Sequence, residues 1–244
     1  MHVAVGVVLG LAIAVAGSAV RRKHGGSQSN LGPVDRACLE RAKLQTLRAQ
    51  ISSHFVYNAL AAVASDIRTD PDEARELLVE LAEFTRYAVR GDRLYVTLSE
   101  ELECVGRYLR LERARFGDRL QVRVEVDPEV LRTPLPVLSL QPLVENAVRH
   151  GVEQGHGVGH VEILGTDIGQ CVELRVSDDG AGIESERARA ALDGDGEGIG
   201  LANVQLRLRT SFGEDYRLRF EPDAGAGTTV VMTVPKAGNG VGSL

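Results

Sequence analysis

Apolar residues recur at helical spacing through the first half of the chain, from residue 34 to about residue 66. One stripe of this segment has alternating spacings of three and four residues, as the side of a helix that packs on another helix does. The stripe consists of Leu44, Leu47, Ile51, His54, Asn58 and Ala61. The pattern predicts a long helix whose stripe packs against a second copy of the chain.

Two further helices are predicted before residue 117. The Thr-Asp-Pro sequence at 69–71 ends the first helix, and proline is tolerated at the first position of the next. Thr97 and Glu100 have the spacing of a capping box, in which each side chain accepts a hydrogen bond from the other residue's backbone N–H. A third helix is therefore expected to follow Thr97, and residues 35–117 form a predicted helical region.

The pattern changes after residue 117. Residues 119–127 alternate between apolar and polar, which is typical of a strand with one buried face. Further strands are expected at 159–165, 171–177, 216–221 and 228–235, helices at 136–152 and 199–212, and a loop at 178–198. Helices interleaved with mostly hairpin-like strands predict a two-layer α/β sandwich with the helices on one sheet face. The expected fold class is α+β, with a second domain at 118–236 and a flexible tail at 237–244.

The first residues have a different composition. Residues 3–20 contain no charged side chain, and a basic cluster at 21–24 follows them directly. A helix of this length spans about 27 Å, close to the thickness of the hydrocarbon core. We therefore expect residues 1–24 to be a single-pass anchor in the cell membrane, with a linker at 25–34 and a cytoplasmic remainder. The alternative is a cleaved signal peptide, although such peptides carry their basic residues before the apolar run.

The charge balance and the cysteines argue against several classes of protein. The net charge of −6 implies no basic face, so nucleic acid is not an expected partner. The three cysteines, Cys38, Cys104 and Cys171, form no CxxC pair. Neither a disulfide framework nor a structural zinc site is expected, and a reducing compartment fits best.

Two adjacent polar residues, Glu145 and Asn146, interrupt an apolar helix. Polar groups inside an apolar helix are costly unless they have a partner. An amide oxygen suits Mg²⁺, which takes few protein ligands and completes its shell with water and phosphate oxygens. Asn146 is therefore a candidate Mg²⁺ ligand, and the alternative is an Asn–Glu pair that caps a neighbouring loop.

Two segments that contain glycine follow. Asp178 comes at the end of a predicted strand and can accept a hydrogen bond from an exocyclic amine such as that of adenine. Gly180 and Gly182 allow the backbone to approach a flat ring or to take a positive φ. Gly198 and Gly200 open a predicted helix, whose free N–H groups favour phosphate. Each segment alone is also ordinary loop chemistry, because Asp-Gly is common in turns.

The Glu145–Asn146 pair and the two glycine segments, taken in this order along the chain, resemble the ATP-binding domain shared by histidine kinases, gyrase, the Hsp90 chaperones and MutL. Asn146 matches its N box, Asp178 to Gly182 its first glycine box, and Gly198 to Leu201 its second. Five segments look like the LytS-type sensor histidine kinases: AQISSHFVYNAL, LAEFTRYAV, LSEELECVGRYLRLERARFGDRL, LPVLSLQPLVENAVRHG and GIGLANVQLRLRTSFG. The resemblance covers about residues 40–235 and implies ATP and Mg²⁺ as cofactors.

By this resemblance His54 is the phosphoacceptor, and its phosphoryl group passes to an aspartate of a response regulator. An imidazole of ordinary pKa keeps a free nitrogen nucleophile near pH 7, which suits this role. Asn58, one turn on, can contact His54 and fix the orientation of the ring. Asn203 fits the helix that follows the nucleotide lid, and Glu145 is expected to assist through Mg²⁺ or a water molecule.

Several positions depart from the family pattern. Ser53 stands where many relatives have proline, and Val56 and Tyr57 replace a typical Leu-Phe pair. These changes remove no reacting group. Many other kinase classes place an acid directly after the histidine as the base, and here that position is Phe55, so the sequence does not assign a base. Phe55 and Tyr57 also suit plain packing.

Two other functions stay open. One is an ATP-binding switch or ATPase of the same domain superfamily that performs no histidine phosphotransfer, and the other is a non-catalytic membrane adaptor. The stripe that contains His54 and the intact glycine boxes argue against both. Arg207 is either a functional residue of the last helix or a solvated charge. His150, His156 and His160 do not favour a metal site, because no Cys or carboxylate completes a ligand set.

Overall fold

A computed structural model describes residues 53–89, 93–155, 157–184, 188, 190–192, 199–222 and 227–236. The predicted membrane segment at 3–20, the linker, the first part of the long helix, Gly198 and the tail lie outside the described residues. In the described ranges, no helix is both long enough and apolar enough to cross a bilayer.

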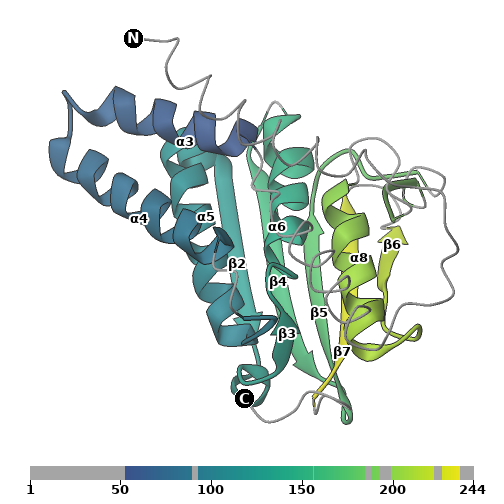
Figure 1. The fold of residues 1–244 in the computed structure, drawn as a ribbon. Coiled ribbons are helices and arrows are strands. Elements are labelled where there is room, and N and C mark those ends of the chain that lie inside the picture. Colours follow the sequence, from purple (N-terminus) through teal and green to yellow (C-terminus); the bar gives the residue numbers. More distant parts are fainter. Residues whose placement is uncertain are drawn as a thin grey trace, which may run out of the picture. The chain divides into compact units, whose positions relative to one another are not determined.

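Three helices form the N-terminal part of the described chain: α3 (Ser53–Asp66), α4 (Pro71–Val89) and α5 (Leu98–Phe116) (Figure 1). The predicted capping box at the start of α5 is confirmed, because Thr97 and Glu100 each accept a hydrogen bond from the other's backbone N–H. An aromatic cluster joins the three helices, with ring centroids 5.0 Å apart for Phe55 and Phe84 and 4.9 Å apart for Phe55 and Tyr108.

Helix α3 buries one face against α4 and α5. Phe55, Ala59 and Val63 are buried there, which confirms the packing role of Phe55. The described members of the predicted stripe do not lie on this buried face. His54 and Ala61 are exposed, and Asn58 is partly buried. Tyr57 is 68% exposed, so its interpretation as a packing residue within this chain is wrong.

The second part of the chain is built around a five-stranded sheet with the order β2-β4-β5-β7-β6. The strands are β2 (Leu120–Val126), β4 (Gly159–Asp167), β5 (Cys171–Asp178), β6 (Leu218–Pro222) and β7 (Thr228–Pro235). The β2–β4 pair is parallel, and the other pairs are antiparallel. A parallel pair needs a crossover connection, and helix α6 (Gln141–Val148) lies within it. The α+β class is therefore confirmed, although the sequence pattern did not reveal the parallel pair.

The helices form one layer on this sheet. Helix α5 contacts β2, α6 contacts β4 and β5, and α8 (Ile199–Phe212) contacts β6 and β7 (Figure 1). Strand β5 shows the alternation that this arrangement requires, because Val172, Leu174, Val176 and Asp178 are buried. Residues of its other face form ion pairs instead, as Arg175 does with Glu221 and Glu173. The predicted two-layer sandwich is confirmed.

Two predicted segments differ from the structure. The helix expected at 136–152 begins only at Gln141 and continues after Val148 as a π-helical turn over Arg149–Glu153. Pro136 instead ends strand β3 (Pro134–Pro136), which pairs with β1 (Tyr95–Thr97), because two prolines favour extended backbone at a strand edge. Residues 137–140 form a turn before the helix begins. Within the expected loop at 178–198, residues 188 and 190–192 are helical.

Candidate functional site

Asp178 ends strand β5 on the side of the sheet that faces the helices. Only 8% of the residue is exposed, and burial raises the pKa of its carboxyl to about 6. The hydrogen bond that the backbone N–H of Gly180 donates to Asp178 Oδ1, at 3.0 Å, acts in the opposite direction. The side chain is thus a partly desolvated acceptor whose position is fixed by the backbone that follows it.

Glycines close the backbone around Asp178. A Cβ on Gly180 would overlap the carbonyl oxygen of His150, and a Cβ on Gly227 would overlap the carbonyl oxygen of Asp178. Gly182 and Gly227 also have φ of +77° and +107°, in the left-handed region that favours glycine. The sequence indicated Gly180 and Gly182 but not Gly227, which lies far along the chain and carries no local motif. At Gly180 and Gly227 the backbone therefore packs too closely to leave room for a side chain.

Helix α6 carries Glu145 and Asn146 away from its buried side. Leu143, Val144 and Ala147 are buried, whereas Glu145 and Asn146 are half-buried. Gln141 Nε2 donates a hydrogen bond to Glu145 Oε2 at 3.0 Å, which orients this carboxylate along the helix. Across the described ranges, no three His, Cys, Asp or Glu side chains gather as a metal site.

Helix α8 places the second glycine segment beside α6. A Cβ on Gly200 would lie 3.6 Å from Pro142 Cβ of α6, an ordinary contact distance. Leu201 is buried in the core, and Asn203 is half-buried. Arg207 is only 4% exposed, and its Nη1 donates to the carbonyl oxygen of Val137 at 2.6 Å. The interpretation of Arg207 as a solvated charge is therefore wrong.

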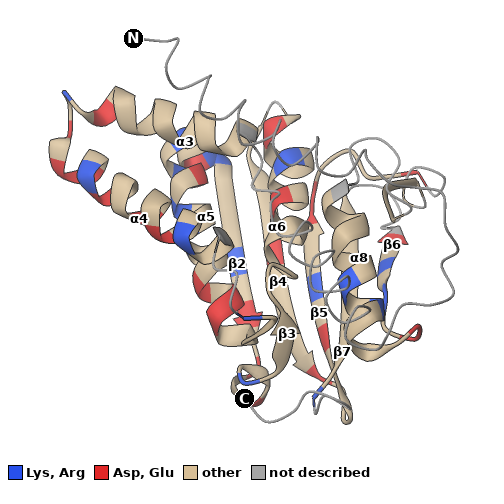
Figure 2. Cartoon of the chain, in the orientation of Figure 1, with Lys and Arg blue, Asp and Glu red and all other residues tan. Residues whose placement is uncertain are grey.

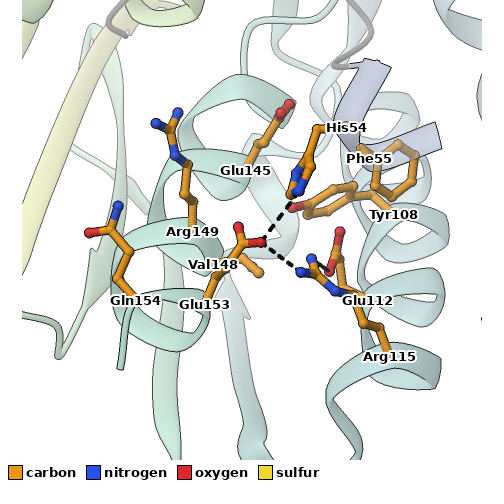
Figure 3. A pocket seen from close by; sticks show the side chains of 10 residues that line it. All are labelled: His54, Phe55, Tyr108, Glu112, Arg115, Glu145, Val148, Arg149, Glu153 and Gln154. Carbon is orange, nitrogen blue, oxygen red and sulfur yellow. Dashed lines mark hydrogen bonds and ion pairs between the residues drawn. The ribbon is translucent and has the colours of Figure 1, made fainter. Parts of the chain in front are cut away.

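His54 lies at the rim of a cavity of about 450 Å³ between α3, α5 and α6 (Figure 3). Its side chain is 65% exposed, and Asn58 Nδ2 lies 3.3 Å from both ring nitrogens. Glu145 of α6 lines the same cavity, so the structure brings His54 and Glu145 together. Asp178, Gly180 and Gly182 gather at the end of β5 and do not line this cavity.

The cavity contains charged groups that the sequence did not single out. Glu153 Oε1 lies 3.8 Å from His54 Nε2 and 2.6 Å from Arg115 Nη2 (Figure 3). Arg115 also lies 3.6 Å from the carboxylate of Glu112, which is buried. Burial raises the pKa of Glu112 to about 7, and Arg115 opposes this shift. One indication was visible in the sequence, because Glu112 and Arg115 are three residues apart on one predicted helix. Such ion pairs are also common on exposed helix surfaces, so this spacing does not by itself mark a site.

Comparison with known proteins identifies both parts of the chain. A family model described as "Histidine kinase" matches residues 42–120. A second model, described as "Histidine kinase-, DNA gyrase B-, and HSP90-like ATPase", matches residues 135–238. The two matched ranges contain His54 and the Asp178 region, respectively.

Curated relatives agree with these matches. The sensor histidine kinase BtsS of Escherichia coli (strain K12) is 34% identical over 200 residues, covering 82% of this chain and 34% of that protein. The sensor protein LytS of Bacillus anthracis is 36% identical over 204 residues, covering 81% and 35%. The sensor histidine kinase YpdA of Escherichia coli (strain K12) is 37% identical over 205 residues, covering 82% and 35%. The chain spans about a third of the length of these relatives, and it belongs to the LytS-type family of sensor histidine kinases.

Proposed function

We propose that this protein is an ATP-dependent histidine kinase that phosphorylates itself on His54. The observation that carries the proposal is the cavity that His54 shares with Glu145. A nucleophile on α3 and the polar side of α6, which lie far apart in the sequence, meet there (Figure 3). Positioning of this kind is the main contribution that a protein makes to phosphoryl transfer.

The described residues fit a bound ATP. The buried carboxylate of Asp178 would accept a hydrogen bond from the adenine amine, beside the turn that Gly180 and Gly182 form. The start of α8, from Ile199 to Asn203, would place backbone N–H groups near the phosphates. Asn146 would hold Mg²⁺ through its amide oxygen, and the ion would spread the charge of the transferring phosphoryl group.

The reaction at His54 follows from the chemistry of a neutral imidazole. The ring nitrogen without a proton attacks the γ-phosphorus, and a nitrogen–phosphorus bond forms. The bond between that phosphorus and the oxygen bridging to the β-phosphate breaks, and ADP leaves with the electron pair. Asn58, within 3.3 Å of both ring nitrogens, would limit the rotation of the ring before the attack. The phosphoryl group would then pass to an aspartate of a response regulator.

A second copy of the chain is the proposed partner of α3. The helix has a single charged residue, Asp66, and is almost uniformly uncharged in Figure 2. Tyr57 and Leu60 are exposed on it, and Ile67 is exposed just beyond it. A second copy of the chain would cover this apolar face. We also propose that residues 3–20 anchor the protein in the cell membrane, with the helical region at 35–117 and the ATP-binding domain at 118–236 in the cytoplasm.

Autophosphorylation of the full chain tests the proposal. The protein is incubated with Mg²⁺ and γ-labelled ATP, and the label is expected on His54 as a phosphoramidate, which acid cleaves and base preserves. His54→Gln should lose the label and keep ATP binding. Ser65→Ala on the same helix is the control, because this exposed hydroxyl bonds to its neighbours Ala62 and Asp66, and the variant should retain the label.

Other results assign other functions. Asn146→Ala should lose the label through weaker binding of ATP with Mg²⁺, and so differ from His54→Gln. A label that survives acid, or that persists in His54→Gln, contradicts His54 as the phosphoacceptor. Release of free phosphate without any protein label supports the ATPase alternative.

A further inference from the structure

The residue next to His54 in the sequence cannot receive a proton from it. Phe55 is buried and packs against the rings of Phe84 and Tyr108. The opposite wall of the cavity supplies carboxylates instead. Glu153, at the end of the π-helical turn after α6, has its Oε1 3.8 Å from His54 Nε2 (Figure 3). Ring and carboxylate therefore come from segments about a hundred residues apart and face each other across the cavity.

The position of Glu153 is fixed by its partner on α5. Arg115 Nη2 donates a hydrogen bond to Glu153 Oε1 at 2.6 Å, and the guanidinium lies 4.5 Å from the centroid of the Phe116 ring. Glu153 is only half-buried, so its carboxylate can face both Arg115 and the ring of His54. A bidentate group such as guanidinium holds a carboxylate in place better than a flexible ammonium does.

We propose that Glu153 accepts the ring proton of His54 when the imidazole is phosphorylated. The inference rests on the proposed function. Attack by the unprotonated nitrogen leaves a positive charge on the ring, and the other nitrogen still carries its proton. That proton passes to a carboxylate oxygen of Glu153, which leaves a neutral phosphohistidine and a protonated glutamate. The proton is the one on Nε2, which already lies 3.8 Å from Glu153 Oε1, so the ring does not have to turn.

The other titratable groups of the cavity are less suited to this role. Glu145 belongs to the Mg²⁺ side of the proposed site and is bonded to Gln141 along α6, and Glu112 is buried, 3.6 Å from Arg115. Tyr108 is fully buried, and its pKa is raised well above the ordinary value by that burial. Arg115 and Arg149 are cations and cannot accept a proton. Glu153 Oε1 lies 3.8 Å from His54 Nε2, which places it within reach of the ring proton.

The test compares two glutamine variants of the full chain. Glu153→Gln keeps an oxygen that can accept from Arg115 but cannot take a proton, so the initial rate of His54 labelling should fall by about 100-fold or more. ATP affinity should stay the same. Glu125→Gln on β2 is the matched control, because this exposed carboxylate pairs with Arg123 outside the cavity and its loss should leave the rate unchanged.

Chemical rescue separates proton transfer from a structural role. Glu153→Ala removes the side chain, and added formate should restore part of the labelling rate by taking the proton in its place. Labelling of Glu153→Gln at the wild-type rate would overturn the inference while leaving the kinase assignment intact. A slow Glu153→Ala that formate does not accelerate also overturns it, because the defect is then structural. Absence of label in the wild type contradicts the proposed function itself.

Discussion

The buried carboxylate of Glu101 on α5 accepts hydrogen bonds from the backbone N–H groups of Leu138 and Leu140, at 2.7 and 2.8 Å. The hydroxyl of Tyr87 on α4 donates a third, at 2.6 Å. Leu138 has φ of +58°, a left-handed conformation that is costly for a leucine. The carboxylate thus ties both helices to the loop that enters α6, and so fixes the start of the helix that carries Glu145.

Tyr87→Phe should destabilise the protein, because it removes one donor from a carboxylate that is completely buried. The loss of a hydrogen bond to a buried charged group costs about 1–3 kcal/mol. Urea denaturation of the full chain measures the free energy of unfolding. Tyr57→Phe is the control, since its hydroxyl is on an exposed side chain and the change should be within about 0.5 kcal/mol of zero. Equal effects in both variants would contradict the role of the Glu101 carboxylate.

The stability of the protein should fall as the pH rises through about 7 because of Glu112. Burial raises the pKa of this carboxyl from 4.5 to about 7, so between these values the folded state holds a proton that the unfolded state has lost. The difference corresponds to roughly 3 kcal/mol. Glu112→Gln has no proton to lose and should be more stable than the wild type at pH 8, with the advantage shrinking toward pH 5. Unfolding curves at the two pH values check this, and parallel curves would contradict it.

Affinity for ATP should fall as the pH decreases through about 6. The pKa of Asp178 is raised to about this value by burial, and the protonated carboxyl presents a donor where the adenine amine needs an acceptor. Asp178→Asn makes that mismatch permanent and should abolish binding at every pH. Isothermal titration measures both effects, with Asp215→Asn on an exposed turn as the control. Unchanged affinity in Asp178→Asn would remove this residue from the proposed site.

Leu60→Glu should separate the proposed dimer into single chains. The substitution places a charge on the exposed apolar face of α3, where a second copy would have to bury it. Leu206→Glu is matched in exposure, at 48% against 44%, but lies on α8 and should leave the dimer intact. Sedimentation of the purified full chains compares the three proteins. A wild type that is already monomeric, or a Leu60→Glu variant that stays dimeric, contradicts this interface.

Local patterns predicted the parts of the structure that depend on neighbouring residues. The capping box at Thr97 and the alternation of β5, which buries Asp178, need only short-range periodicity. The start of α8 was predicted in the same way, because the glycine-rich sequence ends where the helical spacing of apolar residues begins. These features were correct because one face of each element must be buried whatever its partner is.

Long-range contacts were the part that could not be predicted. Arg207 bonds to Val137, which is 70 positions earlier, and Glu153 reaches Arg115 across 38 positions. A charged residue on a helix has the same local pattern whether it is solvated or paired. The burial of Arg207 and the charged cavity beside His54 therefore emerge only when the elements are packed.

Gly180 and Gly106 lie in different surroundings. A Cβ on Gly180 would overlap the carbonyl oxygen of His150, so Gly180→Ala must displace backbone beside Asp178. This should destabilise the fold by about 1–3 kcal/mol and weaken ATP binding as well. Gly106 lies within α5, and a Cβ there meets nothing within 4 Å. Gly106→Ala should therefore stabilise the protein by about 0.5–1 kcal/mol and leave ATP affinity unchanged, because alanine lowers the entropy cost of forming a helix.

Urea denaturation and isothermal titration of the two alanine variants together test whether the turn after β5 contacts the nucleotide. Loss of ATP affinity in Gly180→Ala, measured below the urea range in which it unfolds, shows that the backbone around Asp178 must be close-packed for the nucleotide to bind. If Gly180→Ala binds ATP as the wild type does, the turn after β5 does not contact the nucleotide, and the proposed adenine site moves away from this end of the sheet. If Gly106→Ala lost affinity as well, the effect would reflect a general response of the fold to added methyl groups, because this position is remote from any close contact.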